Sequence, residues 1–401
     1  MVKQVVFFRD RMKLSQTQQA FIRAHEKEVV HDLALRYSGE DMPFLLAQIA
    51  GRQKAEKKMP FWHHHPKLVY PVHLSLEQAS SEVTARYKAT LISPGGALLV
   101  DLTGGLGVDF SILAPHFERA VYVERDETLC RLAAHNFAEL GLGHAEIRHM
   151  ESEAFLPQLE QADLIYLDPA RRDQEGRRVF RIEECSPDLS QLAGVLTGKA
   201  QRVMIKYSPM LDISLAVQTL GSVSEVQVVS VENECRELLF LLTKEAGEPL
   251  FHAVNLKRNG EREHLSFTWE EEGREAAYSL TPGRYLYEPN ASILKAGAFN
   301  TVANRYAVEK LHSNSHLYTS DRLVCDFPGR IFTIDELLIP NRKNIRQFLS
   351  GTKKANIAVR NFPMSVAEIR KKTGLEEGGE TYLFATTLAD GRKVWIIGGK
   401  A

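Results

Sequence analysis

Short apolar runs alternate with amphipathic stretches through the middle of the chain. The apolar runs cover Ala97–Leu102, Ala120–Glu124, His144–His149, Asp163–Asp168, Gln201–Lys206, Glu225–Val231 and Glu237–Thr243. Phe110–His116 separates the first run from the second, and Thr128–Leu140 separates the second from the third. Apolar strands bounded by turns, with helices between them, predict a parallel sheet covered on both faces and therefore an α/β fold.

The N-terminal part of the chain has a helical pattern. Leu14 to about Ala50 carries apolar residues at helical spacing in a charged background, which predicts a small helical region. Ser75 and Gln78 then form a capping-box signature, so we expect a helix from there through roughly Leu91.

Beyond Glu245 the alternation gives way to an α+β pattern. A helix is expected near Ala291–Leu311, and strands are expected at Leu265–Trp269, Ala276–Leu280, Asn356–Val359, Tyr382–Leu388 and Lys393–Ile397. Ser365 with Glu368 forms another capping box, and Gly374 suits a helix C-cap. Asp390-Gly391 is a hairpin signal between the last two strands.

Composition limits the kind of protein. The 401 residues carry 50 Lys and Arg against 51 Asp and Glu, a formal net charge of −1, which argues against a uniformly basic nucleic-acid binder. The four cysteines are widely spaced without a CxxC pair, so reduced thiols in a cytoplasm fit better than a disulfide framework or a zinc site. No apolar run approaches the ~18 residues that a membrane span needs. We therefore expect a cytoplasmic protein of several domains that binds neither a metal nor a membrane.

The segment from Leu98 to Asp109 carries the strongest chemical signal. A hydrophobic strand runs into Asp101 and is followed by the turn Thr103-Gly104-Gly105-Leu106-Gly107 and then by a helix. Glycines let the backbone turn sharply and approach a ligand, and the helix N-terminus offers unpaired N–H groups. Because glycine-rich turns are common, the residues around this turn decide which ligand it suits.

An acid at the end of the second strand supplies that context. Glu124 stands 23 residues after Asp101, where nucleotide-binding sheets place a carboxylate that accepts both ribose hydroxyls. Dinucleotide sites usually show GxGxxG at the first turn, whereas here an acid precedes the glycines. That acid repels a pyrophosphate but can bind the ammonium or sulfonium group of an amino acid, so S-adenosylmethionine fits better than NAD.

A second motif follows the fourth strand. Asp168-Pro169-Ala170-Arg171 puts a carboxylate and a rigid turn at the carboxyl end of the strand, where open α/β sheets bind ligands. After the third strand, His149-Met150-Glu151-Ser152 offers side chains that can meet an adenine.

Three motifs together resemble a known family. They are Glu77–Lys88 (EQASSEVTARYK), Asp101–Asp109 (DLTGGLGVD) and Asp168–Arg172 (DPARR). From about Leu76 to Lys206 the chain resembles class I S-adenosylmethionine-dependent methyltransferases. More narrowly, and through the tail, it resembles a bacterial family that has a C-terminal THUMP-like domain and is related to RNA-cap guanine-N2 methyltransferases.

The resemblance implies an α/β fold with a Rossmann-like seven-stranded class I methyltransferase sheet at 75–245. An N-terminal helical region at 1–74 would precede it. A C-terminal α+β part would follow, made of a ferredoxin-like linker domain at 246–330 and a basic THUMP-like domain at 331–401.

The resemblance also implies roles for individual residues. The cofactor would contact Asp101, Leu102, Thr103, Gly104, Gly105 and Asp109, with Glu124 at its ribose and Glu151 or Ser152 near its adenine. The floor under the transferred methyl would be formed by Asp168, Pro169, Ala170 and Arg171. In amino-methylating relatives the acid or amide of this motif and a backbone carbonyl accept hydrogen bonds from the target amine, and an aromatic residue stacks on the base.

This chain departs from that pattern. Ala170 stands in place of a second proline and Arg171 in place of the aromatic residue, so an exocyclic amine is one target among others. An arginine plane can stack on a base or bind a phosphate, which keeps a nucleic-acid substrate open. The Asp-Pro-x-Arg form also resembles uracil-C5 methyltransferases, but Lys206-Tyr207-Ser208-Pro209 stands where those enzymes need a nucleophilic cysteine. We therefore set C5 chemistry aside.

Several other residues have two interpretations each. Five arginines follow the Asp-Pro dipeptide, at positions 171, 172, 177, 178 and 181. They are interpreted either as a phosphate-binding lip beside the active site or as a solvated loop. His63-His64-His65 is interpreted as a packed loop, because adjacent histidines cannot all face one ion. Cys185 is expected to be an inert thiol rather than a nucleophile. Trp62, Tyr285 and Tyr287 are expected to pack rather than to stack on bases.

The tail is basic. From Arg330 to Thr373 it carries ten Lys or Arg against three acids. A basic α+β module attached to a methyltransferase is how THUMP-type domains bind RNA, whereas the alternative is a solvated helix face. The substrate-binding candidates are therefore Arg171, Arg172, Arg177, Lys353, Lys354, Arg370 and Lys371.

Three functions are consistent with the sequence. The first is an S-adenosylmethionine-dependent RNA methyltransferase acting on a base. The others are an RNA-binding module with a degenerate catalytic floor and a small-molecule methyltransferase whose tail closes the pocket.

Overall fold

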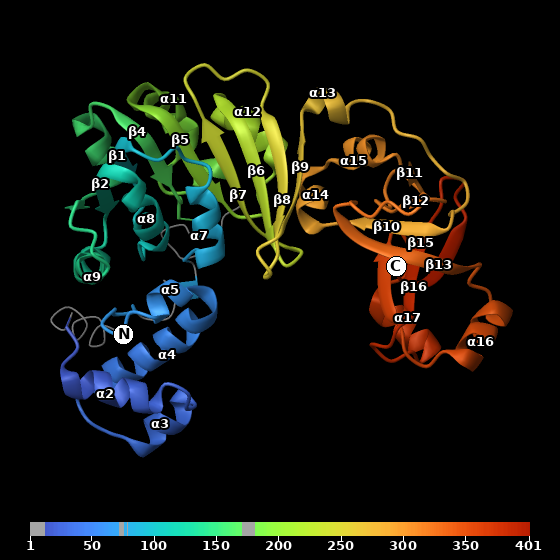
Figure 1. Cartoon of the computed structure of the whole chain (residues 1–401), viewed down its shortest axis with the longest axis horizontal. Helices are drawn as coiled ribbons and strands as arrows, with labels where there is room; N and C mark the ends of the chain where they lie inside the picture. Colours follow the sequence, from blue (N-terminus) through green and yellow to red (C-terminus); the bar gives the residue numbers. More distant parts are fainter. Residues whose placement is uncertain (1–12, 72–75, 78, 171–180) are drawn as a thin grey trace. The chain divides into compact units, whose positions relative to one another are not determined.

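A computed structural model describes residues 13–71, 76–77, 79–170 and 181–401 (Figure 1). The chain divides into two compact units, Met1–Glu225 with Leu238–Gly247, and Val226–Glu237 with Glu248–Ala401. In the part of the chain that the structure describes, no helix has the length and apolar character needed to cross a membrane.

A Rossmann-like sheet begins in the first unit. Its strands are β1 (Gly96–Asp101), β2 (Phe117–Glu124), β3 (Ala145–His149), β4 (Ala162–Leu167), β5 (Ala200–Tyr207), β6 (Val223–Val231) and β7 (Glu234–Leu242). They lie in the order β3-β2-β1-β4-β5-β7-β6, and β8 (Leu250–Leu256) and β9 (Arg262–Phe267) follow β6 in the same nine-stranded sheet. Strands β1 to β5 pair in parallel, and β7 pairs antiparallel with β5. The α/β fold with a Rossmann-like sheet is confirmed, but the sheet has nine strands instead of the seven that the resemblance implies.

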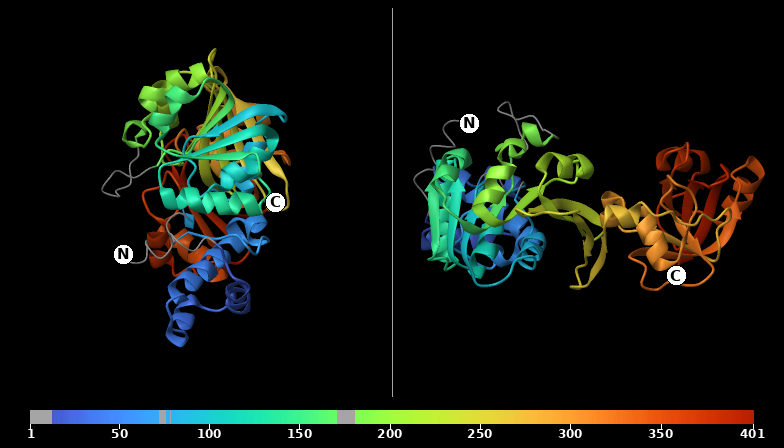
Figure 2. Two further views of the ribbon diagram at one scale, coloured as in Figure 1. Left: turned by 90° about the vertical axis from the view of Figure 1, so that its left-hand side faces the viewer. Right: turned by 90° about the horizontal axis from the view of Figure 1, so that it is seen from above.

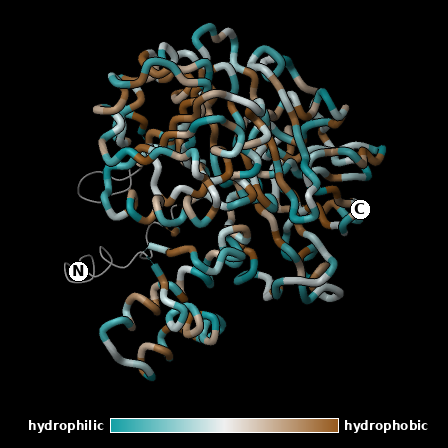
Figure 3. Tube along the Cα trace, turned by 60° about the vertical axis from the view of Figure 1, so that its left-hand side comes forward, coloured by the Kyte–Doolittle hydropathy of each residue, from teal (hydrophilic) through white to brown (hydrophobic). Residues whose placement is uncertain are grey.

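Helices cover both faces of this sheet (Figure 2). They are α7 (Glu82–Ala89), α8 (Val108–Leu113), η1 (Ala114–His116), α9 (Glu127–Glu139), α10 (Ser152–Phe155), η2 (Leu156–Gln158), η3 (Ile182–Glu184), α11 (Leu189–Lys199) and α12 (Ile213–Leu220). Helices α7 and α8 lie on one face, and α11 and α12 lie on the other. Val100, Ile165 and Val203 on neighbouring strands are fully buried, as parallel strands between two helix layers require. Hydrophobic residues accordingly gather along the strands (Figure 3).

The N-terminal helices share a hydrophobic core with the helices of the sheet. They are α2 (Gln16–His25), α3 (Val30–Arg36), α4 (Met42–Lys58) and α5 (Pro60–His63). One buried cluster extends from Ile49 and Trp62 to Val108 and Leu132. Trp62 Nε1 donates a hydrogen bond to Ser111 Oγ on α8 at 3.0 Å. This helical region is therefore packed as part of the first unit.

The helix expected from Ser75 has a different start. In the described residues α7 begins at Glu82, because Ser81 Oγ accepts the N–H of Thr84 at 3.3 Å and caps it. Ser75 lies outside the described residues, as does Gln78.

The second unit contains an antiparallel pair of strands and a seven-stranded sheet. The pair is β8 with β9, the last two strands of the nine-stranded sheet. The sheet strands are β10 (Tyr285–Pro289), β11 (Glu309–Lys310), β12 (Tyr318–Ser320), β13 (Gly329–Leu338), β14 (Asn356–Arg360), β15 (Tyr382–Thr387) and β16 (Lys393–Lys400). Their order is β11-β12-β10-β13-β16-β15-β14. The helices are α13 (Trp269–Glu272), α14 (Ala291–Ala296), α15 (Phe299–Tyr306), α16 (Arg342–Gly351) and α17 (Val366–Thr373).

The local signals in the tail are confirmed. Ser365 and Glu368 form the capping box of α17, and Gly374 ends that helix with φ 74°. Strands β15 and β16 pair antiparallel on either side of Gly391, whose φ is 86°. The domain boundary expected after Arg330 falls within β13, which pairs with both β10 and β16. Both expected C-terminal domains thus contribute strands to one sheet.

Three expectations beyond Glu245 are wrong. Ala276–Leu280 forms only an isolated bridge between Tyr278 and Lys310. The expected helix over 291–311 is divided into α14 and α15, because Gly297 adopts φ 77° and ends the first of them. Trp269 begins α13 rather than extending a strand.

Candidate active site

A cavity of about 590 Å³ opens at the carboxyl ends of β1, β2 and β4. It is lined by all ten residues predicted to bind the cofactor: Asp101, Leu102, Thr103, Gly104, Gly105, Asp109, Glu124, Glu151, Ser152 and Asp168. Pro169 and Ala170 of the predicted catalytic floor line it as well. The fold thus brings together residues that are far apart in the sequence. Arg171, Arg172, Arg177 and Arg178 lie outside the described residues.

The glycine-rich turn packs directly on an aromatic side chain of β2. A Cβ on Gly104 would lie 2.2 Å from the ring of Tyr122. The Tyr122 hydroxyl donates a hydrogen bond to the carbonyl of Gly105. Gly107, with φ 82°, precedes α8, and a Cβ there would lie 2.7 Å from the Phe137 ring. The turn therefore needs glycine for close packing as well as for ligand access.

We expect Gly104→Ala to lower the free energy of unfolding by about 1–3 kcal/mol, because the new methyl overpacks the Tyr122 ring. Gly143→Ala is the matched control, since nothing lies within 4 Å of its added Cβ. Urea denaturation of both variants gives the comparison, and equal stability of the two would contradict the close packing.

Two acids at the cavity are held by backbone N–H groups. Glu124 accepts the N–H of Gly105 at Oε2 and the N–H of Asp126 at Oε1, each at 2.8 Å. Asp101 accepts the N–H of Thr103 at 2.9 Å. Burial raises the pKa of Asp101 well above its ordinary value, against the smaller effect of the Thr103 hydrogen bond. Nearby negative charges on Asp109, Asp168 and Glu124 raise it further. A cationic ligand would stabilise the ionised form of Asp101.

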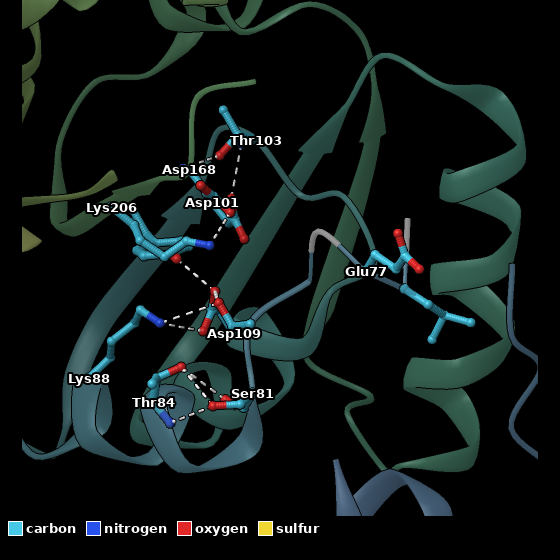
Figure 4. A network of polar contacts seen from close by, with 12 residues as sticks. Glu77, Ser81, Thr84, Lys88, Asp101, Thr103, Asp109, Asp168 and Lys206 are labelled. Atoms are coloured by element: carbon cyan, nitrogen blue, oxygen red, sulfur yellow. Dashed lines mark hydrogen bonds and ion pairs between the residues drawn. The ribbon is translucent and has the colours of Figure 1, made fainter. Parts of the chain in front are cut away.

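Asp109 belongs to a buried network behind the turn. Its Oδ2 accepts hydrogen bonds from Ser80 Oγ at 2.5 Å and from the Tyr166 hydroxyl at 2.7 Å. Its Oδ1 accepts one from Lys88 Nζ at 2.9 Å, and Figure 4 shows Lys88 pointing toward it. Burial alone would raise the pKa of Asp109, but the charges of Lys88 and Lys206 and the two hydroxyl donors outweigh it and lower the pKa. Both carboxylate oxygens of Asp109 are thus hydrogen-bonded to side chains of the protein at the cavity wall.

Asp168 is fixed at both its backbone and its side chain. Its N–H donates to Thr103 Oγ1 at 2.6 Å, and its carboxylate forms an ion pair with Lys206 Nζ from β5. Ala170, two residues on, exchanges backbone hydrogen bonds with Ser186 at 2.9 and 3.1 Å. The Asp168-Pro169-Ala170 segment is therefore a supported floor of the cavity.

Glu151 and Ser152 occupy different depths of the cavity. Ser152 is buried and its hydroxyl donates to the carbonyl of Leu102 at 2.6 Å, so it supports the glycine-rich turn. The Glu151 side chain is 58% exposed and lies 3.8 Å from Arg125. Glu151 is thus the member of this pair at the rim.

Sequence reasoning missed four residues of the site: Ser80, Lys88, Tyr166 and Lys206. Ser80 and Lys88 stood inside a recognised motif, but no role followed from their spacing. Lys206 ends a strand-like apolar run with a charge at the carboxyl edge of the sheet. A charged residue at that position was the feature from which Lys206 could have been predicted, because ligands of open α/β sheets bind at this edge.

The histidine run is a packed segment. His63 Nε2 lies 2.6 Å from Glu26 Oε1. His64 Nδ1 and His65 Nδ1 face the carbonyls of Pro60 and Phe61 at 2.6 and 2.8 Å. Within the described ranges, no three His, Cys, Asp or Glu side chains are grouped so that they could hold a metal ion.

The remaining candidates outside the tail are mostly buried. Trp62, Tyr287 and Cys185 are buried, and Tyr285 is partly buried. Cys185 Sγ donates to the carbonyl of Arg181 at 3.3 Å. None of the four cysteines, all of which the structure describes, forms a disulfide.

Some of the basic residues in the tail make contacts within the fold. Arg370 donates hydrogen bonds to the carbonyls of Leu375 and Ala355 at 3.1 and 3.3 Å. Lys354 lies 3.2 Å from Glu376 in an exposed ion pair. Lys353 and Lys371 are exposed. Of the four predicted tail residues, these last two are the ones best placed to meet a ligand.

Comparisons with known proteins cover both units. Family models match a ferredoxin-like domain at residues 285–328 and a THUMP domain-like segment at residues 329–400. A crystal structure from Porphyromonas gingivalis W83, provisionally assigned as a methyltransferase, is 35% identical, with a TM-score of 0.87 over 96% of this chain and 98% of that one. Two proteins of Mycobacterium tuberculosis, from strains CDC 1551 / Oshkosh and ATCC 25618 / H37Rv, are named as uncharacterised S-adenosylmethionine-dependent methyltransferases. Each is 25% identical over 303 residues, or 75% of this chain and 80% of theirs.

Proposed function

We propose that this chain, which belongs to the family of S-adenosylmethionine-dependent methyltransferases with a C-terminal THUMP-like domain, methylates a base of RNA. The observation that carries the proposal is the convergence of Asp101, Glu124 and Asp168 on one cavity. These carboxylates come from the ends of β1, β2 and β4, where open α/β sheets bind their ligands.

The residues of the cavity fit S-adenosylmethionine. Asp101 offers a buried carboxyl to a cationic amino-acid group, and Glu124 offers a fixed carboxylate to ribose hydroxyls. Gly104 and Gly105 leave the backbone beside them open to a ligand. The cofactor supplies a methyl group that its sulfonium has already activated, so the chain's residues contribute mainly by binding and orientation.

The target base is proposed from the floor of the cavity and from the tail. Asp168 is an acceptor for the N–H of an exocyclic amine, and it lines the cavity with Pro169 and Ala170. The exposed Lys353 and Lys371 of the THUMP-like segment support contact with phosphates. A base in a duplex would have to be flipped out to reach such a cavity.

We expect the affinity for S-adenosylmethionine to fall as the pH is lowered. In the ligand-free protein the pKa of Asp101 is raised, chiefly by burial, so at low pH the carboxyl is neutral. It must lose its proton to pair with a cation, so binding releases protons and strengthens as the pH rises through that pKa. Titration calorimetry in two buffers of different ionisation enthalpy measures the release, and Asp101→Asn should abolish it. A wild-type affinity that is independent of pH would contradict this role.

Charge reversal in the tail tests the RNA substrate. We expect Lys353→Glu with Lys371→Glu to weaken RNA binding by about tenfold and to flatten its salt dependence, because phosphate contacts are lost. The affinity for S-adenosylmethionine should not change. Arg23→Glu with Lys27→Glu is the control, since both residues are exposed on the N-terminal helical region. RNA affinity equal in the two double variants, measured by filter binding, would count against this surface.

A further inference from the structure

Lys206 stands directly behind Asp168. It is the penultimate residue of β5, its side chain is 9% exposed, and its Nζ pairs with Asp168 Oδ2. Asp168 is 32% exposed and lines the cavity, whereas Lys206 is not among the described residues that line it. Figure 4 shows the Lys206 side chain extending toward the Asp168 and Asp101 carboxylates. Any effect of Lys206 on a ligand in the cavity is therefore transmitted through a carboxylate.

The charged residues around Asp168 determine how Lys206 acts on it. Asp101 on β1 and Asp109 on α8 are the negative neighbours: the charge of Asp168 acts on Asp101, and the charge of Lys206 acts on Asp109. Lys206 is the positive group that opposes them. Its ammonium is nearly buried and lies at ion-pair distance from the Asp168 carboxylate. The ion pair also fixes one oxygen, while the Asp168 backbone is held by Thr103.

We propose that Lys206 is a positioning residue for methyl transfer, which holds the Asp168 carboxylate by Oδ2 so that Oδ1 accepts the N–H of the target. This inference rests on the proposed function. In the balanced reaction the target N–H becomes N–CH₃, the sulfonium becomes a thioether, and the released proton passes to Asp168 and then to water.

The test compares S-adenosylmethionine with S-adenosylhomocysteine, which lacks the methyl and the sulfonium charge. Both carry the same amino-acid group, so the effect of Asp101 cancels in the ratio of their dissociation constants. The ratio of the two dissociation constants then depends on negative charge near the sulfur, because only S-adenosylmethionine carries the sulfonium charge. Titration calorimetry gives it at about pH 8 and about pH 6, values that bracket neutral pH.

We expect the wild-type preference for S-adenosylmethionine to stay within about twofold over this range. In Lys206→Met this preference should fall by roughly tenfold at the lower pH, because the Asp168 carboxylate then lacks its cationic partner. Lys206→Gln, which keeps a hydrogen-bond donor, provides a second uncharged variant and should behave alike. Lys206→Arg should follow the wild type. So should Lys199→Met, a matched control at the last residue of α11, just before β5, whose Nζ binds the Leu159 carbonyl.

Wild-type ratios at both pH values in Lys206→Met or Lys206→Gln would overturn the inference. Methyl transfer gives a second readout. In the uncharged variants kcat should fall by about 100-fold with the acid limb of its pH profile displaced upward, and Lys206→Arg should restore most of it. If the wild type methylates no RNA, the proposed function fails, while the ligand ratio still decides the role of Lys206.

Discussion

Asp101→Asn should weaken S-adenosylmethionine binding by on the order of 10- to 100-fold, which corresponds to the loss of one charge-assisted hydrogen bond. The amide oxygen can still accept the N–H of Thr103, so the turn after β1 keeps its support. What the substitution removes is the buried negative charge at the cavity. Titration calorimetry measures the change.

Asp163→Asn is the matched control for Asp101→Asn. Asp163 lies near the amino end of β4 and accepts the N–H of Leu98 at 2.8 Å, at the edge of the sheet opposite the cavity. Its substitution should leave the affinity unchanged. Equal affinities of wild type and Asp101→Asn would show that the cofactor's cationic group does not use this carboxylate.

Lys88→Met should lower the free energy of unfolding by about 3–5 kcal/mol, because it leaves the buried charge of Asp109 without its lysine partner. Lys88 is 0% exposed and binds Asp109 Oδ1. A loss of this size is a large share of the stability of an ordinary domain. Chemical denaturation of the ligand-free protein is the measurement.

A second variant and a control separate charge from packing. Lys88→Met combined with Asp109→Asn should recover part of the loss, since the amide keeps a partner for the hydroxyls without a net charge. Lys67→Met removes an exposed ion pair with Glu139, whose atoms are 3.4 Å apart, and should cost almost nothing. If Lys88→Met were as mild as Lys67→Met, the buried pair would not stabilise the fold.

The sheet and the location of the cavity were predictable because both follow from local patterns. Apolar runs separated by helices specify parallel strands, and parallel strands bring their carboxyl ends to one edge. Glu124 and Asp168 each end such a run, and Asp101 stands one residue before the end of another, so their convergence at that edge could be expected from the sequence alone.

The partners of those acids could not be predicted in the same way. Lys206 meets Asp168 because β4 and β5 are neighbours, and Lys88 meets Asp109 because α7 and α8 pack together. Neither pairing leaves a periodic signal in the sequence. The break of the expected helix at Gly297 had such a signal, since glycine within a helical pattern weakens the prediction.

Counting charges in the tail also had a physical limit. A count treats all basic residues alike, yet Arg330 and Arg360 both pair with the buried Glu288, and Arg370 binds backbone carbonyls. The charge available to a ligand is therefore smaller than the total for this segment.

The most direct test of the proposed function is transfer of labelled methyl from S-adenosylmethionine to total bacterial RNA, followed by nucleoside analysis. With the wild type we expect label in a methylated nucleoside, and with Asp101→Asn at the same cofactor concentration we expect almost none. A wild-type protein that binds S-adenosylmethionine but labels no nucleoside of RNA would contradict RNA methylation.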